Sequence, residues 1–420
     1  MTHPRIPHAA GQCPIPLSEF DRSTGDVNEA VGLPPTVYTD PSFFDFERCA
    51  VFGSEWLCVG RSEQIPEVGD YFTVTLAGTE PVIVVREPGG TINVMSSVCQ
   101  HRAMCITAPP ERPREEWFAP IPQVSGTART FRCPYHWWTY DLDGRLLVAP
   151  SMERRRDFDK AEHGLPRLRT EIWNGFIFAN LDPEAPALAP RLGKIDNLLE
   201  PYGLDDWATT PTDTHEDVPF NWKIMVENFM ESYHNYGLHN RLLKKQEYGE
   251  GAAADGGYQP PYENGDGVIV HCGVAPAIDP AVNPTQRGLF TPVPELTMEQ
   301  RRQLIFAFVP PTLLLGVFPD SGFWFTVQPE TVSSHTLSMG YFFPRPTVEE
   351  KLFPALLDLY DAAIQQFNSQ DLPANLALQV GMRSQFAPRG PLSHLDSFLP
   401  KFNAWLLERY GNADGGTGDG

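Results

Sequence analysis

The sequence predicts an α+β protein that consists of a small antiparallel β domain and a larger domain of mixed strands and helices. From about Trp56 to Arg145, short runs of β-branched and aromatic residues alternate with glycine turn signals, which is typical of antiparallel hairpins. Beyond about Leu165, longer apolar runs are interspersed with helical patterns. The chain of 420 residues is long enough for about two to three domains.

The small domain has two clear strand signals, at residues 71–76 and 81–85, where β-branched and apolar side chains dominate. The pairs Gly89-Gly90 and Asp143-Gly144 each indicate a tight hairpin turn. We therefore expect a compact β domain that presents loops at the ends of its hairpins.

The larger domain combines strands with helices. Apolar runs predict strands near residues 173–179, 304–309, 323–327 and 337–343. Apolar residues at helical spacing cover residues 222–236 and parts of 348–385. This mixture favours an α+β domain, although the order of its strands does not follow from periodicity.

Composition argues against several classes of protein. Hydrophobic residues make up 41% of the chain, yet no run approaches the roughly 18 consecutive apolar residues of a membrane span. The first 20 residues are broken by prolines and lack the apolar core of a secretory signal, so we expect a cytoplasmic protein. The net charge of −21 argues against nucleic acid or an anionic membrane as the partner. Seven cysteines, an odd number, fit a reducing compartment in which thiolates bind metals.

The first chemical motif is a pair of loops in the small domain. Cys99-Gln100-His101 and Cys133-Pro134-Tyr135-His136 each supply one thiolate and one imidazole. Two cysteines on one iron and two histidines on the other are the ligand set of a Rieske [2Fe-2S] cluster. A structural zinc site is the alternative, since two cysteines and two histidines also suit tetrahedral Zn²⁺. Zinc sites more often group like ligands together, so the mixed loops favour the cluster.

The second motif lies in the helical pattern of the larger domain, where Glu231, His234 and His239 follow one another. On a helix, His234 falls only about 60° from Glu231, so the carboxylate can touch the imidazole. His239 would point about 140° away from His234. The backbone must therefore bend or end near Gly237 if both histidines are to bind one metal ion.

Three stretches of the chain resemble the large oxygenase subunit of the Rieske non-heme iron oxygenases. This family includes ring-hydroxylating dioxygenases and choline or betaine monooxygenases. The stretches are the lead-in from Glu55 to Arg86, the two cluster loops with the following residues to Arg145, and the segment from Asn221 to His239. A weaker match near Asp371 extends the resemblance across most of the chain.

The resemblance implies a domain plan. Residues 1–50 would form an N-terminal segment that packs on the catalytic domain, and residues 51–164 a Rieske domain. Residues 165–411 would form a mononuclear iron domain with a helix-grip α+β fold, and residues 412–420 a disordered tail. Two loops stand out, the proline-rich stretch at 108–130 and the glycine-rich stretch at 249–267. Each is either a functional loop, contacting a partner or covering the pocket, or a plain surface loop.

The resemblance also implies roles for individual residues. His234 and His239 match the histidines that bind a mononuclear Fe(II), and Asp371 completes the 2-His-1-carboxylate set. Asp361 and Asp396 are alternative third ligands. Glu231 matches the carboxylate that bridges a cluster histidine, here His136, of one subunit to an iron ligand of the next, which implies an oligomer, a homotrimer by resemblance. Glu231 could equally be a buried acid that simply orients His234.

Asn228 is assigned to the same site, where it orients the iron helix or lines the pocket, and a plain packing role is the alternative. Two positions depart from the family, because Ala103 and Trp137 stand where it often has glycine. Glu231 departs as well, since many ring dioxygenases have aspartate there and members that act on methylammonium compounds can have glutamate.

The function implied is that of a terminal oxygenase that uses O₂ to hydroxylate a small organic substrate. The reaction would be aromatic ring hydroxylation or oxidative N-demethylation with release of formaldehyde. Electrons from NAD(P)H would come through a separate reductase, with or without a ferredoxin, because the chain lacks a dinucleotide-binding glycine fingerprint. The alternative is a Rieske electron carrier whose second domain binds a ligand without catalysis. The substrate, the number of oxygen atoms inserted and the presence of a β subunit do not follow from the sequence.

Overall fold

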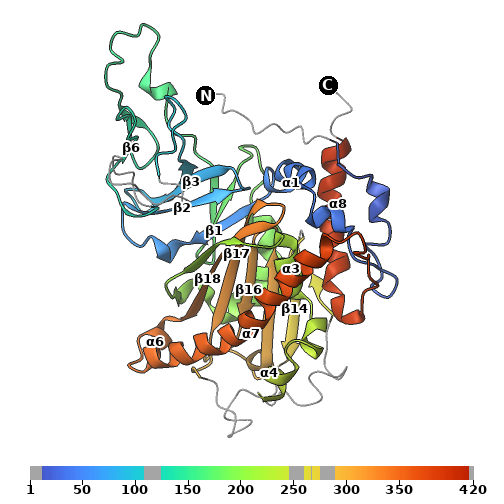
Figure 1. The fold of residues 1–420 in the computed structure, drawn as a ribbon. Helices are drawn as coiled ribbons and strands as arrows, with labels where there is room; N and C mark the ends of the chain where they lie inside the picture. Colours follow the sequence, from blue (N-terminus) through green and yellow to red (C-terminus); the bar gives the residue numbers. More distant parts are fainter. Residues whose placement is uncertain (1–11, 108–123, 246–259, 266, 275–288, 416–420) are drawn as a thin grey trace. The chain divides into compact units, whose positions relative to one another are not determined.

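The computed structural model describes residues 12–107, 124–245, 260–265, 267–274 and 289–415, and these residues form two compact units (Figure 1). The first unit extends from Phe52 to Pro186. The second combines the N-terminal segment up to Val51 with the chain from Ala187 onward. Most of the loop at 108–130 and most of the loop at 249–267 lie outside the described residues.

The first unit consists of three small antiparallel sheets, with strand orders β4-β3-β2-β5, β1-β10-β9 and β6-β7-β8. Their strands are β1 (Leu57–Arg61), β2 (Asp70–Leu76), β3 (Glu80–Arg86), β4 (Ile92–Ser96), β5 (Ser125–Thr127), β6 (Phe131–Arg132), β7 (Thr139–Tyr140), β8 (Leu146–Val148), β9 (Arg169–Trp173) and β10 (Phe176–Asn180). The predicted hairpin turns are confirmed, because Gly89 and Gly90 connect β3 to β4, and Gly144 connects β7 to β8, all with positive φ. The antiparallel β architecture of this unit is therefore the one that the sequence predicts.

The strand predicted near residues 173–179 is confirmed from Phe176 onward as β10, but the first residues of this run are the end of β9 and a hairpin turn. Asn174 and Gly175 have φ values of 46° and 79° and connect β9 to β10. Strand β10 also pairs with β1, so this hairpin belongs to the first unit. An Asn-Gly pair is a strong hairpin signal. Here the apolar residues on both sides of the pair made the run resemble one continuous strand.

The second unit is built on one eight-stranded antiparallel sheet in the order β11-β18-β17-β16-β15-β14-β13, with β12 also paired to β18. Its strands are β11 (Trp207–Thr209), β12 (Asp213–Val218), β13 (Tyr262–Glu263), β14 (Ile269–Val274), β15 (Gln303–Val309), β16 (Leu313–Val317), β17 (Gly322–Thr331) and β18 (Ser334–Pro344). The strands predicted near residues 304–309, 323–327 and 337–343 are thereby confirmed. Most side chains along β16 and β17 are buried, which accounts for their continuous apolar sequence.

Helices α3 and α7 lie across the central strands of this sheet (Figure 1). The helices of the unit are α1 (Pro41–Glu47), α2 (Ala189–Leu199), α3 (Trp222–Met230), α4 (Asn240–Lys245), α6 (Arg345–Val348), α7 (Phe353–Met382) and α8 (Phe398–Gly415). Helix α3 contacts β15 and β17 of the sheet and also contacts α7 and α8. Helices packed on one antiparallel sheet agree with the expected helix-grip α+β fold.

The N-terminal segment is fastened to α3 by a buried ion pair. Glu47, at the end of α1, accepts hydrogen bonds from Lys223 Nζ at 2.9 and 3.0 Å, and both side chains are fully buried. Tyr410 Oη of α8 donates to the same carboxylate at 2.5 Å. Because a buried charge is tolerated only when it is paired and hydrogen-bonded, this cluster ties three distant parts of the chain together.

The C-terminal helix and the lengths of the helices complete the description of the fold. Residues 412–415 continue helix α8, so the predicted disordered tail is wrong for these four positions, and the rest of that tail lies outside the described residues. Among the helices that the structure describes, none is long and apolar enough to cross a membrane.

Candidate metal centres

The cluster loops present two buried thiols and two more accessible imidazoles. Cys99 and Cys133 are buried in the core of the first unit, whereas His101 is exposed and His136 is partly exposed. The Nδ1 atoms of the two histidines lie 3.1 Å apart. Two thiols on the inner side and two imidazole nitrogens on the outer side match the donor set of a Rieske cluster.

The two loops have the same backbone geometry. In each loop the cysteine carbonyl accepts a hydrogen bond from the amide four residues later, at 3.0 Å, from Ala103 N to Cys99 O and from Trp137 N to Cys133 O. Ala103 and Trp137 both adopt left-handed conformations, with φ values of 56° and 64°. These are the positions where the family often has glycine, and the positive φ gives the physical reason.

Tyr140 is a neighbour of the cluster site that the sequence analysis did not single out. Its hydroxyl lies 3.2 Å from Cys99 Sγ and accepts a hydrogen bond from Gln100 N at 3.0 Å. Burial, followed by the hydrogen bond and charge of the Cys99 thiol, raises the pKa of Tyr140 well above its usual value. The hydroxyl is thus neutral and lies beside the sulfur. Its place within the second cluster stretch was the only sequence signal for it.

The second site begins where helix α3 ends. Asn221 caps the start of α3 by accepting a hydrogen bond from Lys223 N at 2.9 Å. The helix ends at Met230, and Glu231 is extended, with φ −90° and ψ 157°. The Glu231 carboxylate accepts hydrogen bonds from the amides of Tyr233 and His234, which start the short 3₁₀ helix η8 (Tyr233–Tyr236). The helix predicted over 222–236 is therefore confirmed for 222–230 and interrupted at Glu231, earlier than the expected bend near Gly237.

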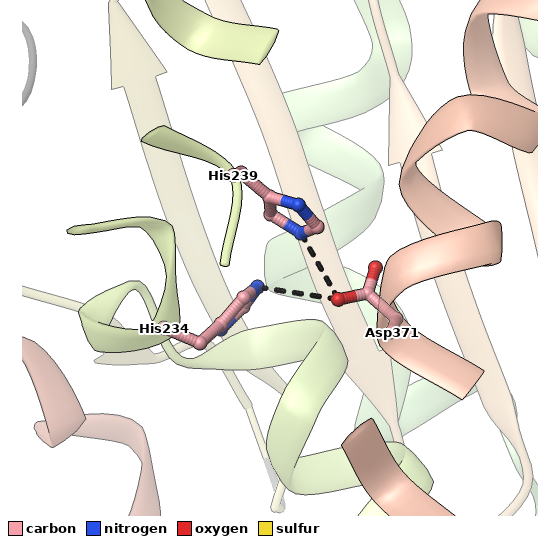
Figure 2. A group of neighbouring side chains, drawn as sticks. All are labelled: His234, His239 and Asp371. Carbon is pink, nitrogen blue, oxygen red and sulfur yellow. Dashed lines mark ion pairs between the residues drawn. The ribbon is translucent and has the colours of Figure 1, made fainter. Parts of the chain in front are cut away.

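This break brings His234, His239 and Asp371 together (Figure 2). The three come from η8, from the residue before α4, and from the middle of α7. His239 Nε2 lies 3.0 Å and His234 Nε2 lies 3.8 Å from Asp371 Oδ1, and one ligand atom of each residue lies within 4.8 Å of the others. Two histidines and one carboxylate at this spacing fit a single metal ion that keeps open coordination positions.

Each histidine of the group is held by its other ring nitrogen. His234 Nδ1 lies 2.5 Å from Glu231 Oε1, and His239 Nδ1 lies 2.8 Å from Gln370 Oε1. An oxygen acceptor at Nδ1 holds a proton there, so Nε2 is the nitrogen of each ring that faces Asp371 and can bind a metal ion. Burial opposes a charge on His239, but hydrogen bonds to Asp371 and Gln370 outweigh it, so the pKa of His239 is raised.

The remaining predicted residues take different places. Asn228 Nδ2 lies 3.5 Å from Asp371 Oδ1, a long contact, so Asn228 borders the group without belonging to it. Asp361 accepts a hydrogen bond from Tyr341 Oη at 2.6 Å, and Asp396 caps the backbone of Ser393 at 2.7 Å. The metal-capable group found among the described residues includes Asp371 and neither alternative. Gln370 was missed because its only partner in the site is 131 residues away in the sequence.

Two further features of this unit are an open hollow and an aromatic cluster. Glu231 and His234 line an open hollow of about 1100 Å³, together with Tyr233, Leu378 and Phe386. Phe229 of α3 packs edge-on against Phe306, Phe323 and Phe325 of the sheet, at ring centroid distances of 5.7–6.0 Å. The hollow thus borders Glu231 and His234, and the aromatic cluster packs on α3, the helix that ends just before them.

Comparison with known families matches both units. Residues 55–167 match the Rieske [2Fe-2S] domain, and residues 204–412 match the ring hydroxylating alpha subunit (catalytic domain). The chain is 37% identical over 211 residues to the glycine betaine monooxygenase oxygenase subunit of Chromohalobacter salexigens, which is 50% of this chain and 44% of that protein. It is 32% identical over 230 residues to the biphenyl 2,3-dioxygenase subunit alpha of Rhodococcus jostii, covering 51% and 45% of the two chains. The chain spans about half the length of these curated relatives.

Solved structures share the fold. A quaternary ammonium Rieske monooxygenase in complex with L-carnitine superposes with a TM-score of 0.71 at 21% identity, over 94% of this chain and 99% of the other. Naphthalene 1,2-dioxygenase from a Rhodococcus species gives a TM-score of 0.73 at 20% identity, over 90% and 94%.

Together the two matched segments define a class, in which a Rieske [2Fe-2S] domain is joined to a ring-hydroxylating alpha catalytic domain. The chain belongs to the Rieske non-heme iron oxygenases. The Rieske domain binds a [2Fe-2S] cluster and the catalytic domain of this family binds a mononuclear iron, and the two groups of donor atoms fit these cofactors. The match of residues 55–167 to a Rieske [2Fe-2S] domain favours the cluster over the structural zinc site that the sequence left open.

Proposed function

We propose that this chain is the terminal oxygenase component of a multicomponent system that hydroxylates a small organic substrate with O₂. The observation that carries this proposal is the convergence of His234, His239 and Asp371 from three separate elements. An electron carrier would need only the cluster loops, and it would have no use for a second set of metal ligands with open positions. The family relationship of both units supports the same function.

The residues of the second site have distinct tasks in this proposal. His234, His239 and Asp371 hold Fe(II), which when bound supplies open coordination positions for O₂. Glu231 and Gln370 fix the ring orientations of the two histidines through their Nδ1 atoms. Asn228 donates to Asp371 and so restrains the carboxylate.

Cys99, Cys133, His101 and His136 hold the [2Fe-2S] cluster that receives electrons. The donor is a reductase, with or without a ferredoxin, and the location is cytoplasmic, where thiols stay reduced. We also propose a homotrimer in which Glu231 of one copy bridges His136 of a neighbouring copy to its own His234, so that electrons pass from the cluster to the iron. The exposure of His101, the partial exposure of His136 and the open hollow beside Glu231 support transfer between copies.

Two substrate classes follow from the relatives, and their products separate them. A methylammonium substrate, as in the glycine betaine monooxygenase, would be hydroxylated at a methyl group that leaves as formaldehyde. An aromatic substrate, as in the biphenyl dioxygenase, would acquire ring hydroxyl groups. The aromatic cluster around Phe229 suits either class, because aromatic faces bind both cationic methyl groups and rings.

The test is substrate turnover by the reduced protein with matched variants. With a reductase and NADH, the protein should convert a methylammonium or an aromatic compound in an O₂-dependent reaction. The variant His234→Ala should lose at least about 100-fold of this activity, because a missing ligand removes the iron. His215→Ala, which removes an exposed histidine of β12, is the control and should keep it. Full activity of His234→Ala would overturn the assignment of the iron site, and a parent protein that converts neither class of compound would favour an electron carrier.

A further inference from the structure

We propose that Asn375 and Gln379, two buried amides on α7, are positioning residues that fix the register of α7 along α3. In that register Asp371 lies opposite His234 and His239. The inference rests on the proposed function, in which Asp371 is a metal ligand. Neither amide touches the three ligands, so their effect is exerted through the helices.

Gln379 attaches α7 to the first turn of α3 and to the N-terminal segment. Its Oε1 accepts a hydrogen bond from Asn221 N at 2.7 Å, and its Nε2 donates to Tyr38 O at 3.0 Å. Free backbone amides occur only in the first turn of a helix, so the start of α3 offers Gln379 one unique position. Asn221 is itself anchored, because its Nδ2 donates to Val332 O at 2.6 Å.

Asn375 makes a second attachment one turn closer to the metal group. Its Nδ2 donates to Asn228 Oδ1 at 3.2 Å, and Asn228 Nδ2 in turn lies 3.5 Å from Asp371 Oδ1. Asn375 and Gln379 have exposed fractions of 0% and 1%. Asn221 at the start of α3 contacts Gln379, whereas Asn228 near the end of α3 contacts Asp371, which is earlier in α7. The two helices are therefore antiparallel along this row of polar side chains.

The spacing of the row determines which residue faces the histidines. Asp371, Asn375 and Gln379 follow one another at intervals of four, so they share one face of α7. A shift of one turn, about 5.4 Å, would replace Asp371 with Phe367 or with Asn375. Phe367 already packs edge-on against the His239 ring at 4.9 Å, which fills the neighbouring position. Only the observed register presents a carboxylate to both histidines.

Stability alone does not explain these amides. Asn375 Oδ1 is buried and has no hydrogen-bond partner in the described part of the chain. A buried polar atom without a partner destabilises the folded state, and an apolar residue of similar volume would avoid this loss. The best-attested use of buried amides between helices is to select one register, as Asn does in coiled coils.

The test compares metal binding in variants of the full chain with an intact cluster. Asn375→Leu and Gln379→Leu should each weaken Fe(II) binding at the mononuclear site about 10- to 100-fold, the range for residues that support a ligand. They should also change the electron paramagnetic resonance signal of the nitric oxide adduct of that iron, which reports ligand geometry. Gln379→Glu keeps the acceptor for Asn221 N and loses the donor to Tyr38 O, so it should fall between these variants and the parent.

Two control variants separate positioning from general stability. Gln366→Leu makes the same chemical change on an exposed face of α7, where the amide reaches only Ala362 O of its own helix. Phe353→Leu loosens the buried start of α7, which packs on Phe343, without touching the polar row. Both should bind Fe(II) within about threefold of the parent protein, well inside the effect of a lost supporting residue.

Each outcome of this comparison either supports or overturns the positioning role of Asn375 and Gln379. Weakened Fe(II) binding in the amide variants with normal binding in both controls supports the inference. Parent-like affinity in Gln379→Leu and Asn375→Leu, or an equal loss in Phe353→Leu, overturns it. If either leucine variant fails to fold, the affinity of Gln379→Glu decides in the same way. If His234→Ala bound Fe(II) as tightly as the parent protein, this result would instead refute the proposed function.

Discussion

Glu231 combines two structural tasks in one carboxylate. Its Oε2 accepts hydrogen bonds from the amides of Tyr233 and His234, and its Oε1 holds His234 Nδ1. A side chain that binds nearby backbone amides offers the chain an alternative to a continued helix. The same contacts that end α3 therefore turn His234 toward Asp371. In an unbroken helix His234 and His239 would point away from each other.

Glu227, one turn before Glu231, gives the second unit a measurable response to pH. Burial raises the pKa of Glu227 to about 7, and the charges of Glu231 and Asp396 add to this effect, whereas Tyr38 and Lys223 oppose it. The ordinary value is 4.5. Because the folded protein holds this proton more tightly, the stabilising contribution is complete below about pH 4.5 and is lost as the pH rises through about 7.

Glu227→Gln should remove this part of the pH dependence. The free energy of unfolding of the parent protein should fall more steeply between about pH 4.5 and 7 than that of the variant. Urea unfolding at several pH values measures the difference. Glu350→Gln, at an exposed position of the same unit, is the control and should follow the parent. Parallel curves for Glu227→Gln and the parent would contradict the assignment.

At the level of elements, the two cluster loops share one backbone conformation. Each contains a cysteine, a later histidine and a residue with positive φ whose amide bonds to the cysteine carbonyl. A left-handed conformation costs a residue with a side chain about 1–2 kcal/mol relative to glycine. Ala103→Gly should therefore stabilise the first unit by about 0.5–1 kcal/mol, after allowance for the greater freedom of glycine in the unfolded chain.

Urea unfolding followed by the visible absorption of the cluster measures this change. Ala179→Gly, in the buried strand β10, is the matched control and should destabilise the unit by about 0.5–1 kcal/mol. An Ala103→Gly variant that is less stable than the parent would show that the loop conformation is wrong.

The elements that could be predicted from the sequence depend on local chemistry. Turns such as Gly89-Gly90 and the paired Cys and His loops carry their signal within a few residues. The end of α3 at Glu231 could not be predicted, because the carboxylate competes with a helical pattern that continues past it. Gln370 and Asn375 carry no local signal either, since their partners lie more than 130 residues away. Asp371 itself was reached through family resemblance.

At the level of the whole molecule, the proposed path of electrons crosses from one copy to another. This can be tested by mixing two inactive variants. His136→Ala copies should lack a working cluster, and Glu231→Gln copies should lack the bridging carboxylate. When the two are produced together, a cluster of one copy can serve the intact iron site of its neighbour. Mixed oligomers should therefore regain part of the turnover, measured as product formed per iron.

The controls are oligomers of each variant alone, which should remain inactive. If transfer took place within one copy, the mixture would contain no chain with both a cluster and a bridge, and it would stay inactive. Analytical ultracentrifugation of the parent protein separately measures the number of copies and any β subunit. An active mixture together with a monomeric parent protein would contradict the trimer.

The most direct test of the whole account is the content of iron, zinc and acid-labile sulfide per chain in protein purified without oxygen. A [2Fe-2S] cluster and a mononuclear site predict about three irons and two sulfides. His234→Ala should lower the iron to about two and leave the sulfide unchanged. About two irons in the parent protein would contradict the catalytic site, and zinc without sulfide would contradict the cluster.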